Sequence, residues 1–240
     1  MAVGAYNELV ERTNSLINEN LRVQIQKRES DYYALHAQIH PHFLYNILEN
    51  IRMSAEAHGD SDTADMLLAL GKHMRYNLNM SSQPITLEEE LASAKNYLQI
   101  HKMRNKNIRS EILIATEIDQ VYCPRFLLQP LLENALQHGY SLERPLHIRV
   151  QIIDGEEMER PGEVCICIED NGNGIPEEVL LPLKEKLLRK EVEKSNHVGL
   201  LNVNSRLSVF CGAKEGCIFI ESRPGEGTSV ICCLKRRRGQ

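Results

Sequence analysis

The stretch EDNGNGIP, residues 169–176, decides the fold of the second half of the chain. It directly follows an apolar run at 164–169 whose pattern predicts a β-strand. Gly172 and Gly174 allow the backbone to approach a ligand closely and to take dihedral angles that other residues resist. Asp170 therefore lies at the end of a strand, beside a glycine-rich turn. Because no Gly-Lys-Ser/Thr follows, this turn is not a Walker-type phosphate loop.

The residues around this stretch mix helices and strands without regular βαβ alternation, which predicts an α+β sandwich. Strands are expected at 108–118, 146–153, 164–169, 217–222 and 228–235, and helices at 124–138, 177–190 and 198–210. The first half is helical instead, with predicted helices at 6–58, 63–79 and 86–106. Two apolar series in the first helix are out of phase, as in a coiled coil with a stutter. Thr86 and Glu89 form a predicted capping box.

The composition excludes several classes of protein. The chain has 240 residues, 42% of them hydrophobic and 25% charged, with a net charge of −5 that does not suggest a nucleic-acid-binding protein. The basic residues 235–238 are interpreted as a solvated tail. The seven cysteines include no CxxC pair, so reduced and mostly buried thiols are expected. No apolar stretch of about 18 residues and no signal peptide is visible.

A first chemical signal is QIHPHFLYN at 38–46. Pro41 is expected to kink the helix, and His42 and Asn46 share one helical face because they are four residues apart. A neutral imidazole is a good nucleophile toward a phosphoryl group when its second nitrogen is oriented. His40 is interpreted as a bystander.

Three further segments accompany the glycine-rich turn, namely PLLENALQHG at 130–139, HVGLLNVNSRL at 197–207 and GEGT at 225–228. The amide oxygen of Asn134 suits Mg²⁺, which prefers oxygen ligands. Gly199 precedes a helix whose N-terminal amides favour phosphate. Two questions stay open here: Arg206 contacts either a phosphate or other protein groups, and the GEGT turn is either a plain hairpin or part of the ligand site.

Together these segments resemble LytS/YesM-type sensor histidine kinases, with a phosphoacceptor segment followed by the N, G1, G2 and G3 boxes of the GHKL-type ATPases. The resemblance implies that His42 accepts the phosphoryl group, that Asn46 orients either His42 or a hydrolytic water, and that Glu133 is a catalytic carboxylate. The general base stays unassigned, because no acidic residue follows His42. The residues implied to bind Mg-ATP are Asn134, which is also the metal ligand, His138, Asp170, Gly172, Gly174, Gly199, Leu200, Gly227 and Thr228.

The resemblance also implies the organisation of the whole molecule. Residues 1–106 would form a signalling helix and a dimerisation and phosphotransfer region, and 107–240 the ATP-binding domain. The activity would be ATP-dependent autophosphorylation and transfer to an aspartate of a response regulator, in a homodimer. The chain would be the cytoplasmic region of an inner-membrane-anchored protein, with a sensor domain N-terminal to it. The alternatives are another GHKL-type ATPase and a nucleotide-binding signalling module without histidine phosphorylation.

Overall fold

The computed structural model describes residues 41–78, 83–139, 144–190, 198–213 and 215–236. The chain divides into two compact units, Met1–Ile47 and Leu48–Gln240. The long helix predicted at 6–58 is described only from residue 41, so its coiled-coil part and the kink at Pro41 lie outside the described residues. Within the described ranges, no helix combines the length and the apolar character needed to cross a membrane.

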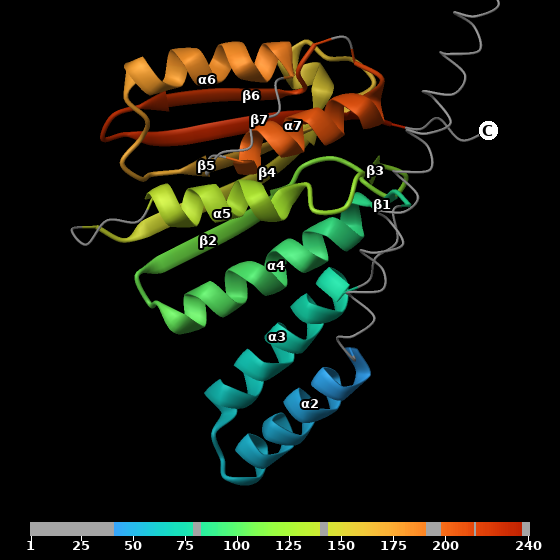
Figure 1. Cartoon of the computed structure of the whole chain (residues 1–240), viewed down its shortest axis with the longest axis vertical. Coiled ribbons are helices and arrows are strands. Elements are labelled where there is room, and N and C mark those ends of the chain that lie inside the picture. Colours follow the sequence, from blue (N-terminus) through green and yellow to red (C-terminus); the bar gives the residue numbers. More distant parts are fainter. Residues whose placement is uncertain (1–40, 79–82, 140–143, 191–197, 214, 237–240) are drawn as a thin grey trace, which may run out of the picture. The chain divides into compact units, whose positions relative to one another are not determined.

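The second unit is built around a five-stranded sheet (Figure 1). The strand order is β2-β4-β5-β7-β6. Only the pairing of β2 with β4 is parallel, and the other neighbours are antiparallel. The strands are β2 (Ile108–Ile114), β4 (Leu146–Asp154), β5 (Glu163–Asp170), β6 (Ile218–Arg223) and β7 (Gly227–Lys235). This mixed sheet with helices confirms the predicted α+β class.

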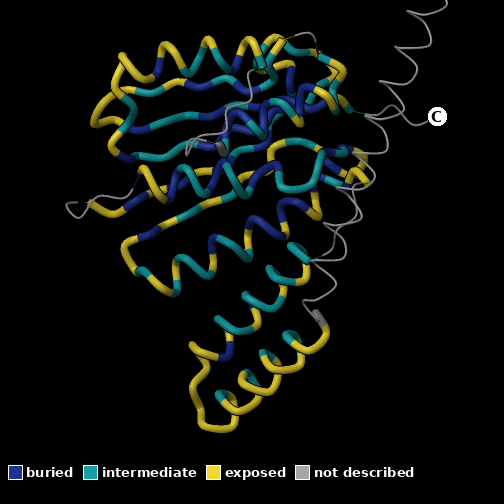
Figure 2. Tube along the Cα trace, viewed as in Figure 1, coloured by how far each residue is buried: buried dark blue, intermediate teal, exposed yellow. Residues whose placement is uncertain are grey.

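Side chains alternate across the sheet, and one face carries the core. On β4, Ile148, Val150 and Ile152 are buried, whereas His147 and Arg149 between them are exposed. Three helices, α5 (Leu128–Gly139), α6 (Glu177–Arg189) and α7 (Val198–Cys211), cover the buried face (Figure 1), and Figure 2 shows the central strands as the most buried part of the unit. One apolar core therefore fixes the helices that carry the predicted site residues.

The helix α4 (Leu87–Arg104) belongs to the same core, because Leu87, Leu91 and Leu98 are buried in it. Its predicted capping box is present: the amide of Glu89 donates to Thr86 Oγ1 at 3.2 Å, and the amide of Thr86 donates to Glu89 Oε2 at 3.1 Å. The strand β1 (Ile85–Thr86) directly precedes α4 and pairs antiparallel with β3 (Tyr122–Cys123), which follows later in the chain. The second unit thus contains residues on both sides of position 106.

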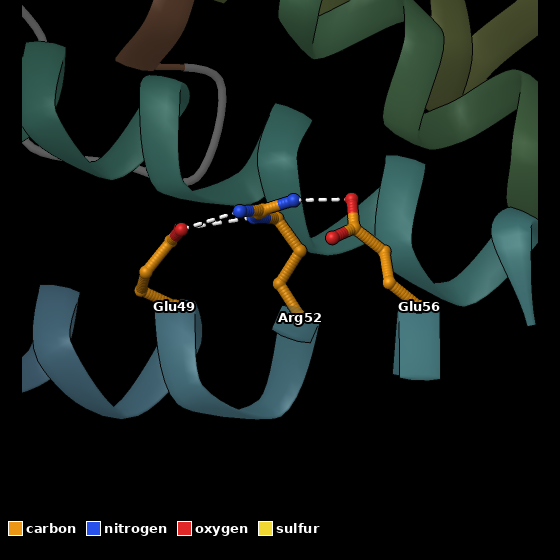
Figure 3. Close-up of polar contacts among 3 residues, drawn as sticks. All are labelled: Glu49, Arg52 and Glu56. Atoms are coloured by element: carbon orange, nitrogen blue, oxygen red, sulfur yellow. Dashed lines mark hydrogen bonds and ion pairs between the residues drawn. The ribbon is translucent and has the colours of Figure 1, made fainter. Parts of the chain in front are cut away.

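Two helices precede this core, α2 (Pro41–Ala57) and α3 (Ser61–Leu78). On α2, Figure 3 shows Arg52 between Glu49 and Glu56, with Arg52 Nε donating to Glu49 Oε2 at 3.0 Å. Exposed ion pairs of this kind add little stability. Most of α2 is exposed in Figure 2, and it needs packing against another surface to be stable.

Three features differ from the sequence-based expectations. The helix predicted from residue 124 begins at Leu128, after Phe126 takes a φ of 57°, which a helix does not allow. The first strand ends at Ile114 rather than 118. Cys165 and Cys233, which face each other on β5 and β7, form a disulfide, so the expectation of seven reduced thiols is wrong for this pair.

Candidate functional site

A cavity of about 480 Å³ lies in the second unit, within the usual range for small-molecule sites. It brings together segments far apart in the sequence. Its lining includes six residues that the sequence predicts to bind the nucleotide: Asn134, His138, Asp170, Gly174, Leu200 and Thr228. Much of the remaining lining is apolar and comes from the sheet and from α6. A cavity with an apolar wall and a few polar groups suits a ligand with an aromatic ring and a polar part.

Six residues of the helix α5 line this cavity, namely Leu131, Asn134, Ala135, Gln137, His138 and Gly139. Glu133 is not among them. Its side chain points about 100° away from that of its neighbour Asn134, and its Oε1 accepts a hydrogen bond from Gln129 Nε2 at 2.8 Å. The structure therefore does not bring Glu133 into the cavity beside Asn134, and its catalytic role stays a prediction.

Asp170 is the central acidic group of the cavity, and glycines make room for it. A Cβ on Gly172 would lie 2.1 Å from Gly139 Cα and 2.7 Å from Asp170 Oδ1. A Cβ on Gly227 would lie 1.9 Å from the backbone oxygen of Asp170. Both positions thus require glycine, although neither residue is part of the cavity lining itself. This close packing places the Asp170 carboxylate at the wall of the cavity.

The pKa of Asp170 is raised by burial, against hydrogen bonds from the backbone amides of Gly172 and Thr228 and the nearby charges of His138 and Arg144. The Gly172 amide donates to Asp170 Oδ1 at 2.8 Å. A carboxylate at a cavity wall can accept a hydrogen bond from a ligand amine.

Asn134 leaves a polar atom beside the cavity without a partner in the described part of the chain, as expected where a polar ligand binds. Its Nδ2 atom is buried and has no hydrogen-bond partner among the described residues, and buried polar atoms are seldom left in that state. A Cβ on Gly199 would approach this atom at 3.2 Å, which places the start of α7 against the Asn134 amide. Gly199 therefore supports the site as a neighbour of Asn134 rather than as a lining residue.

Two residues near the site carry no sequence signal that would have identified them. Arg144 Nη2 donates to the backbone oxygens of Gly172 at 2.6 Å and Gly225 at 2.9 Å, joining the two glycine-rich turns. Lys186 of α6 lines the cavity. The open question about GEGT is answered in part, because Thr228 lines the cavity while Gly225 also makes a turn contact, its amide donating to Asn173 O at 2.7 Å.

Arg206 contacts protein groups rather than the cavity. Its Nη1 and Nη2 atoms donate to the backbone oxygens of Arg125 at 3.2 Å and Phe126 at 2.7 Å, and it is absent from the cavity lining. This supports the structural interpretation of the two that the sequence left open.

The predicted acceptor lies in the first unit, on the exposed surface of α2. Asn46 Nδ2 lies 3.2 Å from His42 Nδ1, as the four-residue spacing predicts. An asparagine amide can be turned over, so either its oxygen or its nitrogen can face the ring. With the oxygen facing Nδ1–H, the lone pair of His42 Nε2 is free.

Two family models match the chain: "Histidine kinase" over residues 30–109, and "Histidine kinase-, DNA gyrase B-, and HSP90-like ATPase" over residues 124–238. The chain is 32% identical to sensor histidine kinase YesM of Bacillus subtilis, covering 97% of this chain and 38% of YesM. It is 40% identical to sensor histidine kinase BtsS of Escherichia coli, covering 87% of this chain and 34% of BtsS. It is 34% identical to the B. subtilis protein YwpD, covering 94% of this chain and 77% of YwpD. The chain thus spans little more than a third of the named kinases.

Proposed function

Because this chain belongs to the histidine kinase family and carries its ATPase domain, we propose that it transfers the γ-phosphoryl group of ATP to His42. A lone pair of the imidazole would attack the phosphorus, the bond from phosphorus to the β–γ bridging oxygen would break, and ADP would leave. The chain's contribution to such a transfer is mainly positioning and electrostatics.

One observation carries this proposal, the cavity that joins Asn134 of α5 to Asp170 at the end of β5. Asp170 would accept a hydrogen bond from the exocyclic amine of adenine, while the apolar wall receives the ring. Leu200 at the start of α7 and Thr228 of β7 border the same space. Gly172, Gly174, Gly199 and Gly227 are proposed to let the backbone approach the nucleotide, and His138 to face its polar part.

We also propose that Mg²⁺ binds with the nucleotide in this cavity, at Asn134. Among the described residues, no group of three or more His, Cys, Asp or Glu side chains could hold a metal ion. Asn134 would therefore supply an amide oxygen, and phosphate oxygens and water the remaining ligands, as is usual for Mg²⁺. When bound, Mg²⁺ would neutralise charge that develops on the phosphate oxygens.

For the acceptor, we propose that Asn46 holds the imidazole of His42 through Nδ1 and leaves Nε2 as the nucleophile. The exposed position of His42 allows a nucleotide domain to reach it. Glu133 keeps its predicted role only as a hypothesis, because it does not line the cavity and its carboxylate accepts a hydrogen bond from Gln129.

The dimer and the further partners are proposals too. Phe43, Ile47 and Ile51 are 62%, 39% and 48% exposed on α2 at four-residue steps, and such an apolar stripe is stable only when covered. We propose that a second copy covers it, with residues 1–106 as the dimerisation and phosphotransfer region and 107–240 as the ATP-binding region. Onward transfer to a response-regulator aspartate, and a membrane sensor domain beyond this cytoplasmic part, stay predictions.

The test is incubation of the chain with Mg²⁺ and γ-labelled ATP, followed by measurement of acid-labile, base-stable phosphate on the protein. We expect label on the wild type and none on His42→Ala. The matched control is His40→Ala, which removes the neighbouring imidazole and should keep the label. Label that survives in His42→Ala would place the acceptor elsewhere.

The nucleotide site is tested separately with Asn134→Asp and Asp170→Ala. Both should lose autophosphorylation while circular dichroism and thermal unfolding show a retained fold. Normal turnover in either variant would refute the assigned site. ATP binding without any label on the wild type would favour the nucleotide-binding module.

A further inference from the structure

Three consecutive glutamates open α4, and they lie in different surroundings. Glu88 and Glu89 are exposed, and Glu89 belongs to the capping box. Glu90 is only 1% exposed. A carboxylate that is taken out of water needs compensating hydrogen bonds or charges. The partners of Glu90 therefore show what this buried group does.

Glu90 caps the helix that carries Asn134. Its Oε1 accepts from the amide of Leu128 at 2.9 Å, and its Oε2 accepts from the amide of Phe126 at 3.2 Å. The first amides of a helix have no partner within it and are favourable for an anion. The local sequence CPRFLLQ, residues 123–129, offers no Ser, Thr, Asp or Asn for this role. The cap of α5 thus comes from another helix, 38 residues away in the sequence.

The same carboxylate is bound from α3. The Tyr76 hydroxyl donates to Glu90 Oε2 and also accepts from the amide of Phe126 at 3.2 Å. The Tyr76 ring meets the Phe126 ring edge-on at 5.2 Å, and the guanidinium of Arg125 lies 4.9 Å from its centroid. The turn before α5 is therefore fixed by α3 and α4 together.

The helix α7 contacts this turn from its other side. Arg206 donates to the carbonyls of Arg125 and Phe126, and burial lowers the pKa of Arg206, against the charge of Glu90, which raises it. The start of α7 lies against the Asn134 amide through Gly199. Both helices that meet at Asn134 are thus held at the turn that Glu90 organises.

We propose that Glu90 is a positioning residue for nucleotide binding. It fixes the position of Asn134 by capping the N-terminus of α5, and its hydrogen bond with Tyr76 couples that position to α3. Leu128 and Asn134 are six residues apart, or about 9 Å along a rigid helix. A shift at the first turn therefore moves the Asn134 amide. The inference rests on the proposed nucleotide site and goes beyond it by assigning a residue that does not line the cavity.

The test compares Glu90→Gln with Glu88→Gln, an exposed glutamate on the same helix, in the full chain. Glu90→Gln keeps the size of the side chain but turns an amide donor toward backbone amides. We expect it to raise the Kd of Mg-ATP about ten-fold and to speed hydrogen exchange at 128–134 without nucleotide. Glu88→Gln should change neither. A folded Glu90→Gln with the wild-type Kd, measured well below its unfolding temperature, would reduce Glu90 to a stability role and overturn the proposal.

Tyr76→Phe tests whether α3 acts on the site through Glu90. It also provides the test of the proposal if Glu90→Gln does not fold. It removes only the hydroxyl and keeps the ring against Phe126 and Arg125. We expect about a three-fold rise in the Kd of Mg-ATP and no further rise when it is added to Glu90→Gln. A wild-type Kd for Tyr76→Phe, or additive effects in the double variant, would show that Tyr76 does not act through Glu90. The Kd of Mg-ATP and the hydrogen-exchange rates can be measured without phosphorylation of His42. Failure of the kinase reaction would therefore not prevent this test.

Discussion

Replacing Gly199 by alanine would add one methyl group at the point where α7 meets the Asn134 amide. The added Cβ would lie 3.2 Å from Asn134 Nδ2, 3.8 Å from its Oδ1 and 3.9 Å from its Cγ. The first distance is shorter than ordinary van der Waals contact, so the amide must give way by a few tenths of an ångström. The methyl group therefore acts on the side chain that we propose to bind Mg-ATP.

The substitution is expected to affect thermal stability and the affinity for Mg-ATP in opposite directions. Alanine is favoured over glycine inside a helix by up to about 1 kcal/mol, so thermal stability should stay unchanged or rise slightly. Misplacing a positioned group by about 1 Å lowers a reaction rate about 100-fold, which corresponds to roughly 2.7 kcal/mol of lost interaction free energy. A displacement of about a third of that size predicts a loss of about 1 kcal/mol, which is about five-fold in the Kd of Mg-ATP.

The assay is titration with a fluorescent ATP analogue in the presence of Mg²⁺, alongside a thermal unfolding curve for each protein. Gly71→Ala on α3 is the matched control, since a Cβ there would meet no atom within 4 Å. It should show the helix stabilisation with a wild-type Kd. If Gly199→Ala also bound Mg-ATP with the wild-type Kd, the contact between α7 and Asn134 would have no role in binding.

Four other outcomes are expected. Because burial raises the pKa of Asp170 above its usual 3.8, the Kd of Mg-ATP should rise as the pH falls through that raised value, and Asp170→Asn should lack this component. With Cys165 and Cys233 joined, the denatured protein should show five titratable thiols before reduction and seven after it; seven before reduction would exclude the disulfide. In the folded protein, Cys217 should be the first of the five free cysteines to be alkylated near pH 7, as judged by mass spectrometry, because a hydrogen bond from Cys211 lowers its pKa to about 6. Thr86→Ala should lower the free energy of unfolding in urea by about 1 kcal/mol, whereas Thr86→Ser should not.

The sequence predicted the elements that depend on local pattern. Strand β4 follows from apolar alternation and β5 from a continuous apolar run, and the Thr86 capping box follows from a four-residue signature. The contact of Asn46 with His42 follows from helical spacing alone. The glycine-rich turn indicates the position of Asp170 because the backbone is crowded there. A side chain at Gly172 would clash with Gly139 and with the Asp170 carboxylate.

Features that depend on distant contacts could not be predicted in this way. The N-terminus of α5 was placed too early, because its cap is Glu90 on another helix rather than a nearby polar residue. The bridge from Arg144 to two turns has no local signal. Sequence adjacency groups Glu133 with Asn134, although a helix points such neighbours in different directions. The disulfide joins residues 68 positions apart.

The packing of α4 has a practical consequence for anyone trimming the chain. Leu87, Leu91 and Leu98 fill the same apolar core as the sheet helices, and Glu90 accepts hydrogen bonds from the amide of Leu128, the first residue of α5, and from that of Phe126 in the turn before it. A fragment starting at residue 107 would expose that apolar surface and leave those amides to water. A fragment starting ahead of Ser61 would retain both, together with Tyr76 of α3, which also binds Glu90, and it should still fold by itself and bind nucleotide.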